Sequence, residues 1–275
     1  MPVDNGLYNR SGDIWWDERE PLSTLRTMVN PGRVGYFRSV LVERLGRDPR
    51  GLRALDVGCG GGLLAEEFAR LGCAVTGVDP SEPSLETARA HAAASGLAID
   101  YRAGNGEALP CDDAAFDLVY CCDVLEHVDS VERVIVEIAR VLRPGGVFLY
   151  DTVNRTLLSR LIIVGIAQEW PVTRFLPRGL HDWRMFIKPA ELHAIMARHG
   201  LVARGVVGLA PALNPLALLH ALYLFRRGRL SYGQVGARLR FKVSRDRSAS
   251  YAGYALKPPL DALGLALKDH GSDRP

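Results

Sequence analysis

Ala54-Leu55-Asp56-Val57-Gly58-Cys59-Gly60-Gly61-Gly62 is the stretch that decides the fold of this chain. The apolar run over 52–57 predicts a strand that is buried on both faces of a sheet. The glycines after it permit a sharp turn and let a ligand approach the backbone closely, because they carry no Cβ. Apolar residues at helical spacing over 63–71 then predict a helix. The order strand, glycine turn, helix is typical of a nucleoside-binding site.

Two acidic residues follow predicted strands near this turn. Asp56 lies at the end of the first strand, and Asp79 comes directly after a second apolar run over 74–78. Asp79 stands about where an acid that binds a ribose is expected. We therefore expect Asp56, Gly58, Gly60 and Asp79 to bind a cofactor that contains a nucleoside.

The turn favours S-adenosylmethionine over a dinucleotide. A dinucleotide fingerprint would require a glycine where this chain has Leu63, and no phosphate-binding loop with its lysine is present. Acidic residues beside a glycine turn suit a cationic cofactor, and S-adenosylmethionine carries a sulfonium and an amino group. A nicotinamide oxidoreductase and a cofactor-binding protein without catalysis remain alternatives, and Leu63 argues against the first of them.

The segments that follow alternate between strands and helices. Apolar runs over 99–103, 116–121 and 147–150 predict strands, and an amphipathic pattern over 131–142 predicts a helix that Arg143-Pro144-Gly145-Gly146 ends. This alternation predicts an α/β fold, doubly wound, with a mostly parallel sheet covered by helices on both faces. Ligands of such sheets bind outside the carboxyl ends of the strands.

A second group of functional residues follows the strand over 116–121. Asp123, Glu126 and His127 place two carboxylates and an imidazole within five residues. In a helical turn Asp123 and Glu126 would share a face, and two carboxylates suffice for a weak Mg²⁺ site. The alternative is that the pair Glu126-His127 caps a helix or lines the pocket for the methyl acceptor, and we favour this interpretation over a metal site.

The glycine stretch resembles the first motif of class I S-adenosylmethionine-dependent methyltransferases. Further motifs follow in the order found in the ubiquinone-biosynthesis O-methyltransferases, which methylate hydroxyls of polyprenylated catechols. The resemblance implies a seven-stranded Rossmann-like sheet with helical lid insertions, and it spans roughly residues 13–210. The motifs are Trp15-Trp16-Asp17, Asn30-Pro31-Gly32-Arg33, Leu125-Glu126-His127-Val128, Thr152-Val153-Asn154-Arg155-Thr156, Gly179-Leu180-His181-Asp182-Trp183 and Phe186-Ile187-Lys188-Pro189-Ala190-Glu191-Leu192.

The resemblance also assigns roles to single residues. It implies that Arg33, Gly58, Asp79 and Cys122 bind the cofactor and that Asn105 or Gly106 lies near the adenine. It further implies a Mg²⁺ site on Asp123, Glu126 and His127 in some members. The family usually has glutamate where this chain has Asp123, and the part after residue 220 is more basic than expected, so the acceptor could instead be a natural-product phenol.

The expected reaction is transfer of a methyl group to a phenolic hydroxyl, which must lose its proton. His127 or His181 could accept this proton, since an unperturbed imidazole titrates near neutrality. We favour His127, with Glu126 as its orienting partner. The alternative function is methylation of nitrogen or carbon in a secondary metabolite by an enzyme of the same fold.

The chain is expected to form one domain with insertions. We expect a helix over Tyr8–Glu20 that caps the cofactor, a linker over Pro21–Asn30 and a helix over Arg33–Leu45. Trp15 and Trp16 could instead anchor the core or a homodimer. The predicted segments are a helical cap (1–46), the cofactor-binding core (47–153), a helical insertion or lid (154–187), the rest of the sheet with a basic insertion (188–260) and a tail (261–275).

Composition is typical of a soluble enzyme that acts on a small molecule. A net charge of +3 predicts no nucleic-acid partner, and five unevenly spaced cysteines predict reduced thiols. No apolar core of a signal peptide is visible over 1–10, which favours the cytoplasm. The apolar stretches 157–167 and 213–225 are too short to span a bilayer. They predict a lid, and peripheral contact with a membrane is compatible with it, because arginines follow the second stretch.

Overall fold

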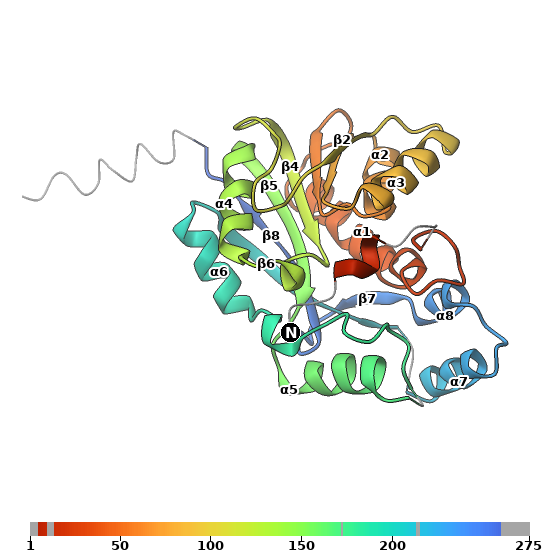
Figure 1. Ribbon diagram of the computed structural model, residues 1–275. Helices are drawn as coiled ribbons and strands as arrows, with labels where there is room; N and C mark the ends of the chain where they lie inside the picture. Colours follow the sequence, from red (N-terminus) through yellow and green to blue (C-terminus); the bar gives the residue numbers. More distant parts are fainter. Residues whose placement is uncertain (1–4, 10–13, 172, 213–214, 260–275) are drawn as a thin grey trace, which may run out of the picture.

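An eight-stranded sheet in the order β3-β2-β1-β4-β5-β8-β6-β7 forms the centre of the computed structural model (Figure 1). The structure describes residues 5–9, 14–171, 173–212 and 215–259. Strands β1 to β5 are parallel, β8 runs antiparallel between β5 and β6, and β7 pairs with β6 at the edge. The strands are β1 (Arg53–Val57), β2 (Ala74–Asp79), β3 (Asp100–Ala103), β4 (Phe116–Cys122), β5 (Leu142–Val153), β6 (Val202–Pro211), β7 (Phe241–Ser244) and β8 (Ser250–Leu256).

This topology confirms the predicted doubly wound, mostly parallel α/β fold. The described strands number eight rather than seven. The additional strand is β7, which lies in the basic insertion and pairs with the far end of β6. The sequence of β7, Phe241-Lys242-Val243-Ser244, has two apolar residues and lies among charged neighbours. It therefore gives no strong signal for a strand.

Helices cover both faces of the sheet. One core cluster joins apolar residues of α1, α2 and α3 to one face, whereas α4 and α6 pack on the other. Figure 1 shows these two groups on opposite sides of the strands. The helices are α1 (Asn30–Ser39), α2 (Leu63–Arg70), α3 (Glu82–Ala94), α4 (Val131–Val141), α5 (Leu157–Ser159), α6 (Pro189–Arg198), α7 (Pro215–Arg226) and α8 (Tyr232–Leu239).

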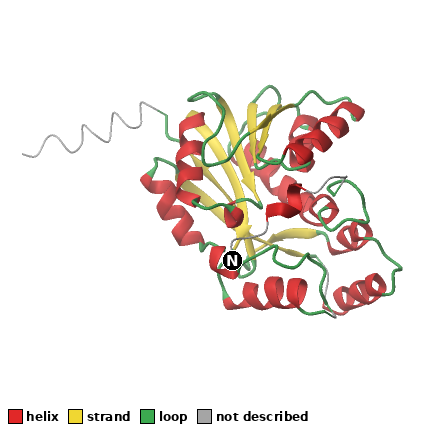
Figure 2. Ribbon diagram, viewed as in Figure 1, coloured by secondary structure: helices red, strands yellow, loops and turns green. Residues whose placement is uncertain are grey.

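Short 3-10 and π-helical segments complete the described helical structure. The π-helical segments η2 and η3 flank α1, and η5 continues α5. Figure 2 shows α5 with its continuation, α7 and α8 grouped beyond one end of the sheet. The segments are η1 (Asn5–Asn9), η2 (Leu25–Val29), η3 (Val40–Arg44), η4 (Leu125–His127), η5 (Arg160–Glu169) and η6 (Trp183–Met185).

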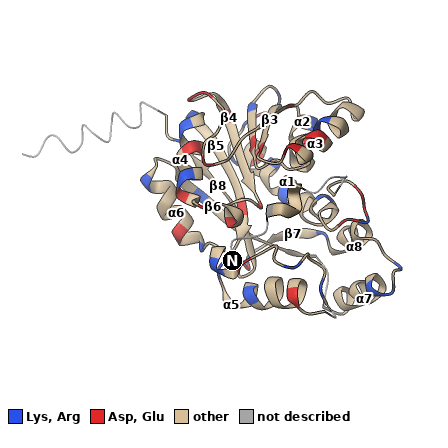
Figure 3. Cartoon of the chain, viewed as in Figure 1, with Lys and Arg blue, Asp and Glu red and all other residues tan. Residues whose placement is uncertain are grey.

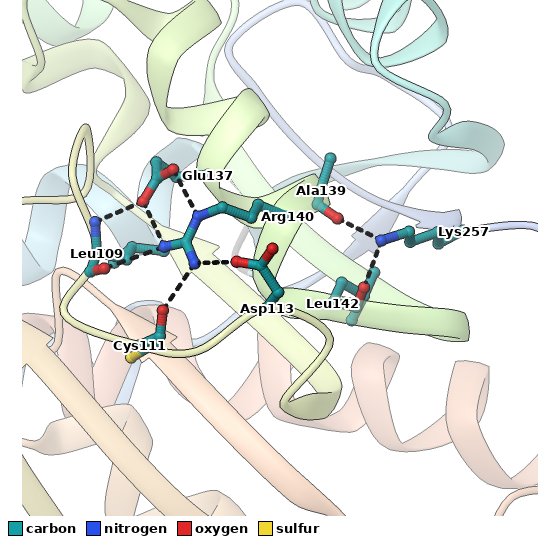
Figure 4. Close-up of polar contacts among 8 residues, drawn as sticks. All are labelled: Leu109, Cys111, Asp113, Glu137, Ala139, Arg140, Leu142 and Lys257. Atoms are coloured by element: carbon teal, nitrogen blue, oxygen red, sulfur yellow. Dashed lines mark hydrogen bonds and ion pairs between the residues drawn. The ribbon is translucent and has the colours of Figure 1, made fainter.

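A polar network fixes the carboxyl-terminal end of α4 (Figure 4). Lys257 donates through Nζ to the carbonyls of Ala139 (2.6 Å) and Leu142 (2.7 Å), which a helix end leaves without partners. Arg140 donates to the carbonyl of Cys111 (2.7 Å) and to the carboxylate of Asp113 (2.7 Å). These contacts tie the loop before β4 to the helix that precedes β5.

The amino-terminal region differs from the sequence prediction. The expected helix over Tyr8–Glu20 is wrong, since the described residues form η1 and a series of turns. The indoles of Trp15 and Trp16 bind different partners there, Ser84 and the carbonyl of Gly61, and a turn lets both rings reach them. The prediction of a linker over 21–30 is also wrong, because helical structure begins at Ser23. Pro21 precedes that start, where a missing N–H costs no helical hydrogen bond.

The predicted helix over 33–45 agrees with α1 and η3. The described parts of the two apolar stretches that were predicted as a lid are also helical, in α5 with η5 and in α7. Among the described residues, none of the helices has the length and apolar character to cross a membrane. The predicted tail over 261–275 lies outside the described residues.

Candidate functional site

A cavity of about 690 Å³ lies at the carboxyl ends of β1, β2, β4 and β5. It contains nearly every residue that the sequence assigned to a site. Gly60 and Glu126 are the exceptions, since they lie directly behind the wall. The predicted residues that line it are Arg33, Asp56, Gly58, Asp79, Asn105, Gly106, Cys122, Asp123, His127 and His181.

The glycine turn adopts a backbone that other residues rarely tolerate. Gly58, Gly60 and Gly62 have φ angles of +74°, +49° and +79°. A Cβ on Gly58 would lie 2.3 Å from the side chain of Val124, and one on Gly60 would lie 2.4 Å from the ring of Trp15. The absence of side chains therefore sets both the path of the chain and the width of the cavity at this wall.

Asp79 is held rigidly at the end of β2. Its Oδ2 accepts a hydrogen bond from the N–H of Gly60 (2.9 Å), and its Oδ1 accepts one from the N–H of Ser81 (2.9 Å). Burial raises the pKa of this carboxyl, and the two backbone donors oppose that effect. Each oxygen keeps a lone pair for a ligand hydroxyl. Asp79 thus has the geometry of a ribose acceptor.

Arg33 lies between two acidic residues at the back of the cavity. Its guanidinium is 3% exposed and forms ion pairs with Asp123 and Asp151. Asn30 also accepts a hydrogen bond from it through Oδ1 (3.1 Å). Asp123 reaches this position with a φ angle of +54°, in the left-handed region. The positive charge of Arg33 is therefore compensated by carboxylates within the wall.

Glu126, His127 and His181 form a cluster near Asp123. A side-chain atom of each lies within 4.8 Å of the others. Thr152 donates a hydrogen bond to Oε2 of Glu126 (2.8 Å), while Oε1 has no hydrogen-bond partner among the described residues. Burial lowers the pKa of His127 to about 4 and that of His181 to about 3. Both imidazoles are consequently neutral at pH 7, and the carboxylate of Asp123 opposes the lowering of each pKa.

A side chain that the sequence did not suggest positions His181. Gln168, buried in η5, accepts a hydrogen bond from the N–H of His181 (2.8 Å) and donates one to its carbonyl (3.1 Å). One amide thus fixes the backbone of the loop that carries His181. Burial and the neighbouring Asp123 carboxylate raise the pKa of Glu126, which places a weak acid behind the two histidines.

The predicted Mg²⁺ ligands do not converge as the sequence suggested. Asp123 turns toward Arg33, and the candidate group is Glu126, His127 and His181 instead. Mg²⁺ prefers oxygen ligands, whereas two imidazoles and one carboxylate suit Zn²⁺ and related transition ions. The donor set of this chain does not fit the Mg²⁺ site that the family resemblance implied.

The remaining wall of the cavity is apolar. It comes from η5, α7 and the loop between η5 and η6, which together close the side away from the glycine turn. These side chains carry no polar group that could orient a ligand. They are Ile162, Ile163, Ile166, Phe175, Leu176, Leu218 and Leu222.

The amino-terminal segment and the end of β5 also contribute residues that the sequence did not assign to the site. Tyr8 and Trp15 line the cavity, as do Asp151 and Thr152. The last two could have been found from their place at the carboxyl end of a predicted strand, where ligands of such sheets bind. Tyr8 and Trp15 belong to the segment over 8–20 that was expected to cap the cofactor, but no motif singled out Tyr8.

Comparison with known proteins agrees with this geometry. The family model described as a methyltransferase domain matches residues 55–150, which include the glycine turn and β2 to β5. A ubiquinone biosynthesis O-methyltransferase from Chelativorans sp. (strain BNC1) is 37% identical over 270 residues, 95% of this chain and 96% of the relative. The chain belongs to this methyltransferase family. The expected S-adenosylmethionine-dependent methyltransferase is thereby confirmed.

Other members of the family match most of the chain. The ubiquinone biosynthesis O-methyltransferase of Methylocella silvestris is 44% identical over 219 residues, 76% of this chain and 84% of that protein. The fold also matches a solved S-adenosylmethionine-dependent methyltransferase from Mesorhizobium loti, with a TM-score of 0.52 and 22% identity over 78% of this chain and 95% of the other. The cofactor is therefore S-adenosylmethionine, while the roles of the single residues in the cavity remain predictions.

Proposed function

We propose that this methyltransferase transfers a methyl group to a hydroxyl of a phenolic or catecholic quinone precursor. The observation that carries the proposal is the division of one cavity into two halves. The glycine turn and Asp79 form a polar half, and the side chains of η5 and α7 form an apolar half. The histidine pair lines the same cavity. The relatives described above are named as O-methyltransferases, which supports oxygen over nitrogen or carbon as the acceptor atom.

The polar half fits S-adenosylmethionine. Asp79 offers carboxylate lone pairs to the ribose hydroxyls, and Asn105 and Gly106 lie where the adenine is expected. Asp56 and the backbone at Gly58 would hold the amino-acid part. When bound, this cofactor supplies an electrophilic methyl group on a sulfonium. Because such a transfer is an in-line displacement, most of the catalysis can come from proximity and alignment.

His127 is proposed as the base for the acceptor hydroxyl. The phenolic proton passes to an imidazole nitrogen of His127, while the oxygen forms a bond to the methyl carbon and the sulfur–carbon bond breaks. The neutral imidazole offers a lone pair to this proton, and the carboxylate of Asp123, which raises the pKa of His127, stabilises the imidazolium that forms. Glu126 lies behind it and orients the pair with His181.

Kinetics with two soluble acceptors test the proposal. We expect turnover of catechol and of 4-hexylcatechol, with the higher kcat/KM for the hexyl compound, because its chain enters the apolar half. Ile166→Ser should remove that preference and leave catechol turnover within about twofold. Val243→Ser, at an exposed site on β7, serves as the control. Methylation of an aromatic amine in place of both catechols would contradict the proposal.

We further propose that the enzyme lies on an anionic lipid surface through α5, η5 and α7. Leu157 and Leu216, on α5 and α7, are 76% and 78% exposed, and α7 has no Lys, Arg, Asp or Glu before its last residue (Figure 3). Arg226, Arg227 and Arg229 follow at once. Apolar side chains beside basic residues favour an interface with anionic lipid.

Sedimentation with vesicles tests this contact. Vesicles of phosphatidylglycerol should bind the enzyme and vesicles of phosphatidylcholine should not. Leu216→Ser combined with Leu219→Ser should weaken binding, and Val243→Ser should leave it unchanged. Equal binding of the double variant would contradict the proposed surface.

A further inference from the structure

Five aromatic rings form a continuous row, and the first four of them line the cavity. Trp15 stacks on Tyr8 with ring centroids 5.8 Å apart and an interplanar angle of 16°. Tyr8 meets His127 edge to face at 6.3 Å and 82°. His127 then lies 5.3 Å from His181, which contacts Phe186 at 5.9 Å. This row leads from the glycine turn to the proposed base.

The position of Tyr8 in the row is set by the loop that also holds Asp79. The carbonyl of Tyr8 accepts hydrogen bonds from Oγ of Ser81 (2.6 Å) and of Ser84 (3.1 Å). The indole of Trp15 donates to Oγ of Ser84 (3.0 Å). Ser81 in turn donates its N–H to Asp79. Tyr8 is therefore anchored to the cofactor wall by its backbone, which leaves its ring free to contact His127.

His127 needs such a support, because η4 is a short segment at the rim of the cavity. Its backbone N–H donates to the carbonyl of Val124 (2.8 Å), which fixes the main chain of the turn. The imidazole contacts two rings, that of Tyr8 edge to face and that of His181 at a tilt. Edge-to-face contacts of this kind restrict the orientation of both rings.

We propose that the ring of Tyr8 is a positioning group that holds the imidazole of His127 in line with the acceptor hydroxyl. The inference rests on the proposed function, since it concerns the base of that reaction. It assigns the effect to the aromatic ring and not to the phenolic hydroxyl, because the contact with His127 is made ring to ring. Loss of the ring should lower kcat by about tenfold or more, since a small misalignment of a catalytic group is costly.

Three variants test this role with 4-hexylcatechol as the acceptor. Tyr8→Leu should lower kcat as stated, while KM and the affinity for S-adenosylhomocysteine stay within about threefold. Tyr8→Phe should keep kcat within about twofold of the wild type. Tyr223→Leu, at an exposed site on α7, gives the effect of the same substitution away from the row. Tyr8→Met replaces Tyr8→Leu if circular dichroism shows that the latter does not fold.

Three results would overturn the inference. A normal kcat in Tyr8→Leu would show that the ring does not act. A parallel loss of kcat and cofactor affinity would place Tyr8 in the cofactor wall alone. A Phe variant as slow as the Leu variant would assign the effect to the hydroxyl. Failure of the wild-type enzyme to methylate either catechol would instead contradict the proposed function, so the two failures are distinguishable.

Discussion

The ring centroids of His127 and His181 lie 5.3 Å apart at the wall of the cavity, and the ring planes are tilted by 39°. The first residue follows β4 and the second lies in the loop between η5 and η6, so that sheet and insertion each contribute one histidine. Neither ring carries a charge at pH 7, because burial lowers the pKa of both. The carboxylate of Asp123 raises the pKa of both imidazoles and so favours a proton on the pair, against the effect of burial.

Substitution of His127 should separate catalysis from cofactor binding. We expect His127→Ala to lower kcat by about 10²-fold or more, the range that general bases contribute. Affinity for S-adenosylhomocysteine, measured by calorimetry, should change little, because the polar half of the cavity lies elsewhere. His220→Ala, on the exposed side of α7, is the matched control. A collapse of cofactor affinity would make His127 a structural residue.

The stability of the protein should fall as the pH is lowered through the acid range, partly because of His181. Its pKa is about 3 in the folded protein and about 6.5 in the unfolded chain, so the unfolded chain binds more protons between these values. His181→Asn removes this contribution. The free energy of unfolding of the variant should fall less steeply below pH 6.5, by up to about 1.4 kcal/mol per pH unit. Urea titrations at several pH values measure the slope, and an unchanged slope would contradict the prediction.

Much of the site could be predicted because short sequence motifs encode it. The turn from Gly58 to Gly62 requires positive φ angles, and glycine is the residue that supplies them at low cost. Asp79 follows a strand that is recognisable from its apolar run. The carboxyl ends of parallel strands meet at one edge, so these motifs had to converge once the fold class was known.

The other parts of the site and of the sheet could not be predicted, because they depend on contacts between residues far apart in the chain. Asp123 looked like a metal ligand next to Glu126, but the approach of Arg33 from α1 turns it away. Tyr8 and Gln168 act through partners 73 and 13 residues distant, and no local pattern marks them. Likewise, β7 forms a strand because it pairs with β6, although its own sequence gives only a weak strand signal.

Removal of Arg33 should destabilise the protein as well as the site. Arg33→Ala leaves the buried carboxylate of Asp151 and the half-buried one of Asp123 without their cation. Breaking a buried pair in this way costs about 3 kcal/mol or more. Denaturant unfolding at pH 7 measures the loss. Arg19→Ala removes an arginine whose ion pair is exposed and should change stability by less than about 1 kcal/mol. Equal stability of the two variants would contradict the conclusion that Arg33 and the carboxylates of Asp123 and Asp151 compensate each other.

Mg²⁺ and Zn²⁺ should differ in their effect on the enzyme, because they prefer different ligands. Mg²⁺ or its chelation should change kcat by less than about twofold, because Asp123 is engaged by Arg33 and the remaining donors include two imidazoles. Zn²⁺ should inhibit reversibly, since it prefers the nitrogen atoms that the base requires. His181→Ala should weaken this inhibition. A rate that depends on Mg²⁺ would restore the site predicted from the sequence.

Alanine at Gly58 should lower cofactor affinity by more than backbone strain explains. The φ angle of Gly58 is +74° and that of Gly96 is +67°, so alanine is strained at both positions. A Cβ meets nothing within 4 Å at Gly96, whereas at Gly58 it lies 2.3 Å from Val124. Gly96→Ala should therefore cost about 1 kcal/mol of stability and leave binding of S-adenosylhomocysteine unchanged. Gly58→Ala should weaken that binding at least about tenfold, because Val124 must move at the wall of the cavity. Calorimetric titration of both variants with S-adenosylhomocysteine measures the two affinities. Equal affinities would show that the turn does not shape the cofactor site.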